Sequence, residues 1–396
     1  MKSKGHKLGK NVLRLACAAL YLLLLGWAGS WATSNLFGQQ QQQQSASVRW
    51  HPRRAPANAQ FIGDQACAQC HKKMVSLHAQ SAMGMAMEPV ANSKVLIDNP
   101  VMTFRTGPYT YEIRRKEKES SYTVTDGKET ITLPILYAFG QGKAGQTYVL
   151  RHEGAYYESL VSYYNEVQGL DFTIGAPRTV PESLMKALGR KLSENEVGNC
   201  FSCHSTGGVV AGKLNLEKMT PGIRCEGCHG PGGAHAGAAK EGEPSDKLIY
   251  NPSRLSGDQL TQDFCASCHR GNDEFGVLQT MEINNVRFQP YRIFHSKCYS
   301  DDKRISCTAC HDPHQPLVRE VSSYDAKCLA CHSPKDQAAD AKAKPAATAH
   351  DATTVCKVST KDCVTCHMPK IGPPAAHFKF TDHFIRVVKP DEVYPN

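Results

Sequence analysis

The hydrophobic and polar positions of the chain form three different patterns. Residues 15–29 are an almost unbroken apolar run, whereas residues 101–165 contain several stretches in which apolar and polar side chains alternate. In residues 181–192, leucines and a methionine recur at the spacing of one helical face. Alternation is typical of half-buried strands, and a 3.6-residue period is typical of an amphipathic helix. The chain therefore predicts an apolar N-terminal segment, a small antiparallel β insertion and a short helix.

The β insertion contains a strong turn signal. Residues 121–125 and 128–133 alternate, and Asp126 and Gly127 lie between them. The Asp-Gly pair favours the tight two-residue turn that joins antiparallel strands. The sequence therefore predicts a β-hairpin at this point.

The first 32 residues have the order of features found in export signals. Basic residues come first, the apolar run follows, and small residues end it. The apolar run is at the short limit for a membrane span, so residues 1–32 are either a cleaved export signal or an uncleaved N-terminal anchor. Residues 33–60 include six consecutive glutamines and predict a flexible tether.

One short motif, Cys-x-x-Cys-His, occurs seven times in the chain. The motif cysteines are Cys67, Cys70, Cys200, Cys203, Cys225, Cys228, Cys265, Cys268, Cys307, Cys310, Cys328, Cys331, Cys363 and Cys366. The motif histidines are His71, His204, His229, His269, His311, His332 and His367. Because fourteen of the 17 cysteines fall in this one pattern, a disulfide scaffold is disfavoured.

This motif is the attachment signature of c-type haem. The two thiols form thioethers with the two vinyl groups of the porphyrin, and the histidine that follows binds the iron. Zinc also uses Cys-x-x-Cys pairs, but a zinc site needs four ligands and does not require a histidine directly after each pair. The seven copies therefore predict seven covalently bound haem c groups.

The motifs divide the chain unevenly. His71 and His204 are 133 residues apart, whereas the later motif histidines follow one another at intervals of 42 residues or fewer. We therefore expect a first haem segment at residues 61–100, the β-rich insertion at 101–165 and a six-haem segment at 166–396. Because little apolar sequence lies between the later motifs, we expect haems to form the core of a mainly α-helical and irregular fold.

The formal charge of +9 does not indicate a nucleic-acid partner. Five of the positive charges lie in the N-terminal segment. Seven haems would add fourteen propionates, which brings the oxidised holoprotein to about −3 and the reduced form to about −10. The basic composition of the polypeptide is therefore no argument for nucleic-acid binding.

The histidines outside the motifs are candidates for the second axial position on the irons. A histidine or methionine there gives an electron-transfer haem, whereas an open position can bind a substrate. Nine such histidines follow the N-terminal segment, and His51 and His152 among them are interpreted as surface residues. The candidates for ligation are His235, His295, His314 and His383, followed by His350 and His377.

The second ligand of the first haem is open between several alternatives. Met83 and His78 both follow the first motif. Methionine ligation would raise the reduction potential of this haem relative to bis-histidine haems. If the helix continues past His71, His78 would point away from its own haem and could reach only another one. An open position is the third alternative.

At these residues the chain resembles multihaem c-type cytochromes related to the tetrahaem cytochrome that accepts electrons from hydroxylamine oxidoreductase. The resemblance covers most of residues 61–385. It is carried by residues 63–67 with 81–83, 225–235, 307–314 and 363–370. It implies that His235 and His314 ligate haems other than their own, and that haems pack in pairs. Family members often have a histidine at the position of Met83.

Together these features predict an exported electron-transfer protein, periplasmic or otherwise extracytoplasmic, that works between redox partner proteins. Assembly with other cytochromes, or attachment to a membrane through the N-terminal segment, is compatible with this role. The alternative is an oxidoreductase that acts on a small nitrogen or sulfur compound at one five-coordinate haem. No variant motif such as Cys-x-x-Cys-Lys marks such a haem, and no catalytic residue is assigned. We therefore expect an electron carrier rather than an enzyme.

Two cysteines of the expected mature chain, Cys298 and Cys356, lie outside the motifs. An oxidising compartment would permit a disulfide between them. The alternative is two separate thiols that pack near haem.

Overall fold

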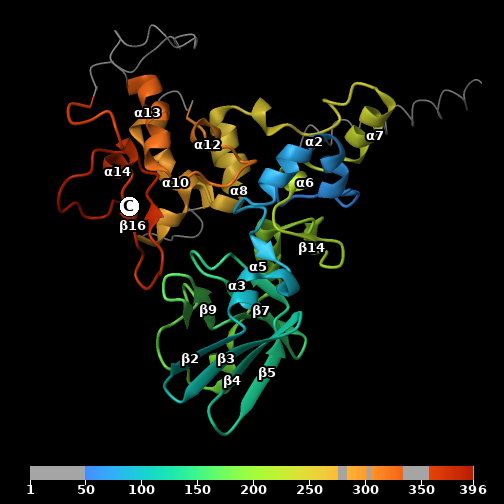
Figure 1. Ribbon diagram of the computed structural model, residues 1–396, viewed down its shortest axis with the longest axis vertical. Helices are drawn as coiled ribbons and strands as arrows, with labels where there is room; N and C mark the ends of the chain where they lie inside the picture. The colour runs from blue at the N-terminus through green and yellow to red at the C-terminus, as the bar shows by residue number, and fades with distance from the viewer. Residues whose placement is uncertain (1–49, 275–282, 301–304, 333–355, 396) are drawn as a thin grey trace, which may run out of the picture.

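The computed structural model describes residues 50–274, 283–300, 305–332 and 356–395. The predicted N-terminal signal or anchor, most of the predicted tether and His350 lie outside the described residues. Figure 1 shows two parts, a strand-rich part and a row of short helices that lies across one end of it. We refer to residues 87–191, which contain β1–β11, as the β module.

Two antiparallel sheets make up most of the β module. The strand order is β2-β3-β4-β5 in one sheet and β1-β6-β7-β8-β11 in the other, and β9 pairs with β10. The strands are β1 (Met87–Glu88), β2 (Val101–Thr106), β3 (Tyr109–Lys116), β4 (Glu119–Thr125), β5 (Thr130–Pro134), β6 (Tyr137–Phe139), β7 (Thr147–His152), β8 (Ala155–Ser159), β9 (Val161–Tyr164), β10 (Gly169–Phe172) and β11 (Gly189–Lys191).

The predicted hairpin is present between β4 and β5. Thr125 pairs with Thr130, and the Asp126 carboxylate accepts hydrogen bonds from the backbone N–H groups of Lys128 and Glu129, each at 2.8 Å. Gly127 has a φ of 87°, which a glycine adopts without steric cost. The loop comprises residues 126–129, so the hairpin lies where the sequence predicts it but its turn has four residues rather than two.

The core of the β module comes from alternate positions of its strands. Along β3 the residues Tyr109, Tyr111 and Ile113 are buried while their neighbours are partly exposed. These side chains join a cluster of twenty buried apolar residues that extends through both sheets and α4. The β module therefore folds around an ordinary hydrophobic core.

Strand structure continues past residue 165, where the sequence pattern predicted its end. Strands β10 and β11 lie beyond that point, and the predicted helix at 181–192 is shortened to α4 (Leu184–Leu188). Gly189 has a φ of 144° and approaches the backbone of Glu158 so closely that a side chain would collide with it. This glycine ends α4 and lets β11 pair with β8.

The remaining elements are short. The helices are α2 (Asp64–His78), α3 (Lys94–Asp98), α5 (Glu194–His204), α6 (Cys225–His229), α7 (Gly233–Glu241), α8 (Ala266–His269), α10 (Gln289–Phe294), α11 (Lys297–Ser300), α12 (Cys307–Cys310), α13 (Asp325–His332) and α14 (Cys363–His367), with 3₁₀ helices η1 (Val90–Asn92), η2 (Pro252–Arg254), η4 (Ile283–Arg287) and η5 (Val321–Tyr324) and the π-helix η3 (Gln259–Cys265). The small strands are β12 (Ser205–Thr206), β13 (Val209–Val210), β14 (Lys213–Leu214), β15 (Thr220–Pro221), β16 (Lys370–Ile371) and β17 (Phe380–Thr381).

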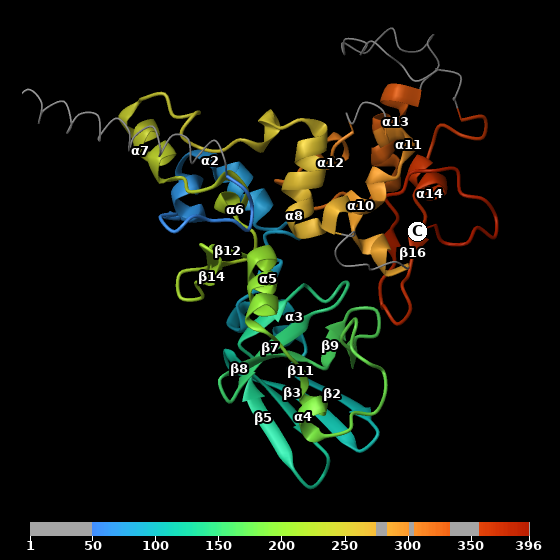
Figure 2. The same ribbon diagram turned by 180° about the vertical axis from the view of Figure 1, so that it is seen from behind.

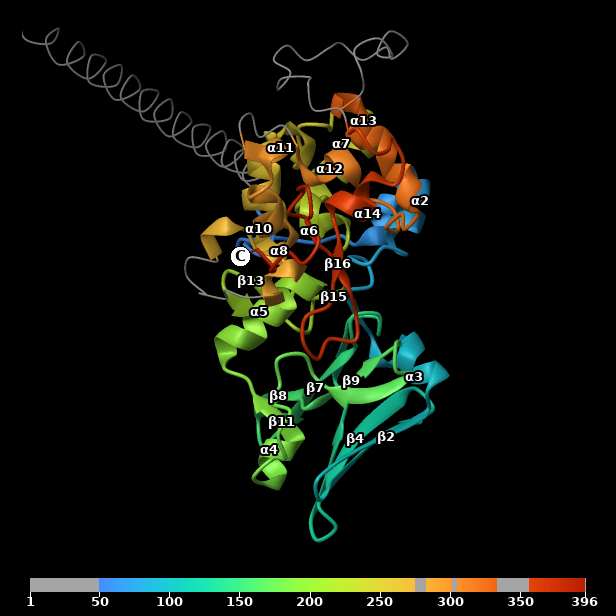
Figure 3. The same ribbon diagram turned by 90° about the vertical axis from the view of Figure 1, so that its left-hand side faces the viewer.

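The helices form a row that crosses the molecule. Figures 1 and 2 show α7, α2 and α6 at one end, α8 and α12 in the middle, and α13 and α14 at the other end. Helix α5 lies between this row and the β module. The loop between β16 and β17 extends from the row towards β9, as the side view in Figure 3 shows. There His377 packs on Tyr164, with ring centroids 4.8 Å apart.

None of the helices in the described ranges is both long and apolar enough to cross a membrane. Cys298 is half-buried and Cys356 is exposed, and both are free thiols in the structure rather than a disulfide pair.

Candidate functional site

The haem motifs lie on short helices that end at the motif histidine. Helices α5, α6, α8, α13 and α14 all have this histidine as their last residue. Residues three apart share one face of a helix, so a single turn presents both cysteines of a motif on the same side. The histidine follows where the helix stops. In α2 the chain continues, but His71 departs from helical geometry with φ −108° and ψ 36°.

Three of the motif histidines face a second imidazole. The rings of His71 and His235 have centroids 6.3 Å apart and planes 19° apart. The ring of His229 lies 6.0 Å from that of His314, with planes 13° apart. A third pair, formed by His311 and His383, has its centroids 6.3 Å apart and its planes 47° apart.

These separations fit the axial ligands of one iron. Two imidazoles bound to opposite faces of one metal ion, with metal–nitrogen bonds of about 2 Å, have ring centres about 6 Å apart. Direct ring stacking would bring the rings closer than this, as in the Tyr164–His377 contact at 4.8 Å. The three pairs therefore have the donor set and the spacing that a bis-histidine haem requires.

Hydrogen bonds of five motif or facing histidines leave one ring nitrogen available. In each of the five, Nδ1 lies 2.9–3.0 Å from a backbone carbonyl oxygen, which can only accept, so Nδ1 carries the hydrogen. The pairs are His204 with Ala86, His229 with Tyr250, His235 with Ser245, His367 with Arg386, and His383 with Thr381. Metal-ligating histidines typically make this contact because it fixes the tautomer and directs Nε2 at the metal.

Burial keeps these imidazoles in the form that binds metal. Desolvation lowers the pKa of His204, His229, His269 and His311 below the usual histidine value, and it lowers the pKa of His383 to about 4. A lowered pKa means that the neutral ring dominates at pH 7. Because only a neutral imidazole can bind a metal through Nε2, the burial favours ligation.

The three facing pairs follow one rule along the chain. His235 follows the third motif and faces the first, His314 follows the fifth and faces the third, and His383 follows the seventh and faces the fifth. Each facing histidine therefore lies opposite a motif histidine that comes two motifs earlier than the motif it follows. The arrangement connects the odd-numbered motifs into one series.

Cysteines of different motifs also lie near one another. In four pairs one thiol lies close enough to shift the pKa of the other, namely Cys67 with Cys225, Cys203 with Cys268, Cys265 with Cys307, and Cys328 with Cys363. Weaker charge interactions also link Cys228 with Cys265, and Cys310 with Cys328. When the motifs are numbered one to seven along the chain, successive neighbours in space are motifs 1, 3, 4, 5, 6 and 7. Motif 2 neighbours motif 4.

A buried carboxylate joins the first and third motifs. Glu226 lies between the two cysteines of the third motif and is 3% exposed. Its oxygens accept hydrogen bonds from the backbone N–H groups of Ile62 at 3.0 Å, Gly63 at 2.8 Å and Gly232 at 2.8 Å. The first two donors precede α2, and the third precedes His235. One side chain therefore holds the first motif and its facing histidine together.

Two other charged side chains also link one motif to another. Asp325, at the start of α13, accepts from the backbone N–H groups of Asp362 at 2.8 Å and Cys363 at 2.9 Å, which links the sixth and seventh motifs. Arg53 donates to Ser202 in α5 and to the carbonyl of Ser267 in α8, which links the second and fourth motifs. None of these three side chains was among the candidates predicted from the sequence. An acidic residue inside a motif, as in Cys225-Glu-Gly-Cys228, was a signal that could have found Glu226.

Other candidates from the sequence lie in different surroundings. Both ring nitrogens of buried His78 contact carbonyl oxygens, those of Pro313 and Ile223. The Nε2 of His377 lies 2.6 Å from an Asp171 oxygen, so the atom that would bind iron is already engaged. His295 packs among aromatic rings.

His71, the histidine for which Met83 was a candidate second ligand, faces the ring of His235. The backbone carbonyl of Met83 accepts a hydrogen bond from Ile223. Within the described residues, no group of three or more His, Cys, Asp or Glu side chains converges as a zinc site would require.

Comparisons with known proteins agree with the haem interpretation. The family model described as cytochrome c554 and c-prime matches residues 177–230, which contain the second and third motifs. The chain is 22% identical over 226 residues to the multiheme cytochrome MtrA of Shewanella baltica (strain OS185). This match covers 50% of the chain and 61% of the relative, so the chain spans about three fifths of the length of that curated relative. No solved structure matches the chain.

The motifs, their geometry and these matches support a multihaem c-type cytochrome that carries covalently bound haem c. Its similarity to a multiheme cytochrome of Shewanella baltica is consistent with the presence of several haem motifs on one chain.

Proposed function

We propose that this chain is an exported cytochrome with seven haems that transfers electrons between redox partner proteins. The observation that carries the proposal is the set of three facing imidazole pairs, at 6.0–6.3 Å, each of which includes a motif histidine. A histidine on both faces closes the iron to substrates and is typical of electron-transfer haems. Bound haem supplies one-electron exchange between ferric and ferrous iron.

The chain's own residues attach and orient the haems. In each motif the two cysteine sulfurs would form the thioethers, and the histidine Nε2 would bind the iron. His235, His314 and His383 would supply the opposite ligands for the first, third and fifth motifs. The carbonyl oxygens that accept from Nδ1 hold the rings in place, which limits reorganisation when the iron changes charge.

The contacts between motifs support a defined route for electrons. The order 1–3–4–5–6–7 agrees with the row of helices from α2 to α14 in Figures 1 and 2. The second motif, on α5, branches from the fourth motif through the Cys203–Cys268 contact and lies next to the β module. The two ends of the row, at α2 and at α14, are therefore the proposed points of electron entry and exit.

Export is proposed from the order of basic, apolar and small residues at 1–32. The seven attachment motifs favour the same location, since c-type haems of bacteria are attached outside the cytoplasmic membrane. A periplasmic or other extracytoplasmic site would give the protein access to redox partners there.

Mass spectrometry of the purified protein tests the haem count. Seven attached haems would add seven increments of about 616 Da each to the polypeptide. Fewer than six increments would contradict the proposal. A fully loaded protein with one high-spin iron would instead favour the alternative, an oxidoreductase that acts at one five-coordinate haem.

A further inference from the structure

We propose that the buried Arg292–Asp382 ion pair is a positioning device that sets the plane of the His383 imidazole relative to that of His311. This inference rests on the proposed function, in which the two histidines ligate one haem iron. Arg292 and Asp382 would touch neither the iron nor the porphyrin. They would act through the backbone that carries His383.

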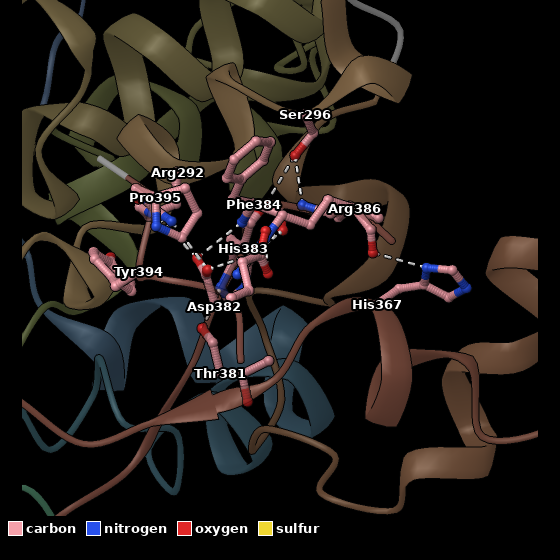
Figure 4. Close-up of polar contacts among 12 residues, drawn as sticks. Arg292, Ser296, His367, Thr381, Asp382, His383, Phe384, Arg386, Tyr394 and Pro395 are labelled. Carbon is pink, nitrogen blue, oxygen red and sulfur yellow. Dashed lines mark hydrogen bonds and ion pairs between the residues drawn. The ribbon is translucent and has the colours of Figure 1, made fainter. Parts of the chain in front are cut away.

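The pair has the geometry of a strong, specific contact. Arg292 Nε donates to one oxygen of Asp382 at 2.8 Å, and Nη2 donates to the other at 3.0 Å. Both side chains are 0% exposed. Such two-pronged pairs fix the orientation of both partners, because the planar guanidinium matches the carboxylate. Figure 4 shows the pair beside His383.

The ion pair reaches His383 through its nearest neighbours. Asp382 directly precedes the histidine, and its Oδ1 also accepts from the backbone N–H of Phe384 at 3.0 Å. On the other side, the buried Ser296 hydroxyl donates to the carbonyl of His383 at 3.0 Å and accepts from Ile385 N–H at 2.8 Å. The backbone is therefore held both before and after the histidine.

Rotation of the ring is fixed as well. His383 Nδ1 lies 3.0 Å from the carbonyl oxygen of Thr381, which is the last residue of β17. Since β17 pairs with β16 and the ion pair holds residue 382, the accepting carbonyl cannot move independently. The orientation of the imidazole is thus defined by the chain around it and not by the haem alone.

Further contacts of Arg292, and of a second arginine, Arg386, restrain the ion pair. Arg292 lies over the rings of Tyr394, at 4.6 Å, and Phe384, at 5.3 Å, and its Nη1 donates to the carbonyl of Pro395. Arg386 donates to Asp382 Oδ2 at 2.7 Å. The carbonyl of Arg386 accepts from the motif histidine His367 at 2.9 Å, so the same cluster contacts the seventh motif.

The result is one imidazole pair unlike the other two. The planes of His311 and His383 are 47° apart, against 13° and 19° in the other pairs. The angle between two axial imidazoles governs the anisotropy of a ferric low-spin haem, so an oblique pair gives a more anisotropic electron paramagnetic resonance (EPR) signal than a near-parallel pair. The fifth haem should therefore be distinguishable from the first and third.

The test is low-temperature EPR of the oxidised full-length holoprotein and four variants. Arg292→Lys keeps the positive charge but loses the two-pronged contact, and Ser296→Ala removes the contacts to His383 and Ile385 without burying an unpaired charge. His383→Ala tests the ligand itself. The matched control is Arg114→Lys, since Arg114 makes the same two-pronged pair with Glu112, at 2.8 Å for both bonds, but on the exposed face of the β module.

We expect the most anisotropic low-spin signal, with the intensity of one iron, to move by more than its linewidth in Arg292→Lys and by less in Ser296→Ala. The other low-spin signals and the haem count should not change, and Arg114→Lys should match the unaltered protein. If Arg292→Lys does not accumulate, Ser296→Ala decides alone. Unchanged signals in the folded variants would overturn the proposal, provided that His383→Ala yields one high-spin iron. If His383→Ala yields none, the proposed ligation itself is wrong, and this inference falls with it.

Discussion

The β module and the row of motif helices differ in what fills their interiors. The β module contains one cluster of twenty buried apolar residues. The described residues of the row instead contain separate small clusters, one of four (Trp50, Ala55, Leu260 and Phe264) and one of two (Phe288 and Tyr291). Strands that bury alternate side chains can fold on that basis alone. The row has short helices, and its buried apolar side chains form only small clusters. We infer that haem supplies the missing core of the row but contributes nothing to that of the β module.

The charged residues of the two parts also have different roles. In the β module the arginine pairs, such as Arg114 with Glu112, lie at the surface, where they contribute little to stability. In the row, Glu226 and Asp382 are buried and bind backbone N–H groups or arginine, Glu226 within the third motif and Asp382 directly before the facing histidine His383. Buried charges are costly unless fully paired, so their presence near the motifs indicates positioning rather than simple stabilisation.

The largest expected effect comes from preparing the polypeptide without haem attachment. The β module should remain folded, because its core contains no motif residue, while the row from residue 225 to 395 should lose its structure. Hydrogen exchange measures this directly: backbone amides of β2–β5 should stay protected and those of α6–α14 should exchange freely. Equal protection in both parts would show that haem is not the core of the row.

The next effect concerns the proposed axial ligands. Replacement of His235, His314 or His383 by alanine should convert one iron from low spin to high spin in each variant and make that haem reactive towards carbon monoxide. His152→Ala, at the end of β7, is the control and should change neither property. Optical and EPR spectra at low temperature provide the measurement. A low-spin count that stays constant in all three variants would refute the assignment.

A smaller effect is expected from Glu226→Gln. Loss of the negative charge weakens three hydrogen bonds to buried backbone donors, which we expect to cost about 2 kcal/mol. Exchange of the amides of Ile62, Gly63 and Gly232 should therefore accelerate roughly thirtyfold, while exchange in β2–β5 stays constant. The control is Glu243→Gln, an exposed glutamate of the same row. Identical exchange in both variants would remove Glu226 from the account.

The smallest effect is expected from a substitution that alters only the β module. Gly127→Ala places a side chain at a φ of 87° and should lower the free energy of unfolding of the β module by roughly 1–2 kcal/mol, with no change in any haem spectrum. The same substitution at Gly237, in the middle of α7 and with open space around it, should not destabilise the protein. A change of haem spectra in Gly127→Ala would mean that the two parts are coupled more tightly than their separate cores imply.

Sequence reasoning located the features that depend on neighbouring residues. The Asp126-Gly127 turn and the motif helices are local, so short patterns predicted them. The end of the β module was misplaced because β10 and β11 pair with strands already formed, which a local pattern does not encode. His377 was a candidate ligand, but its ring contacts Asp171, which is 206 residues away in the sequence.

The candidate site also has one part that the sequence predicts and another part that depends on tertiary packing. The fourteen motif cysteines and seven motif histidines can be read from spacing alone. Which imidazole faces which motif depends on chain segments that return from two motifs further on, and this is set by tertiary packing. The contact between Arg292 and Asp382 joins residues 90 positions apart that carry no motif of their own, so no sequence pattern indicates it.

The most direct test of the central claim is a spin count by low-temperature EPR of the fully oxidised protein. The account holds that facing histidines close the irons of the first, third and fifth motifs. It predicts at least three low-spin ferric irons, two with similar, less anisotropic signals and one with a more anisotropic signal. Fewer than three low-spin irons in protein that carries all its haems would contradict it.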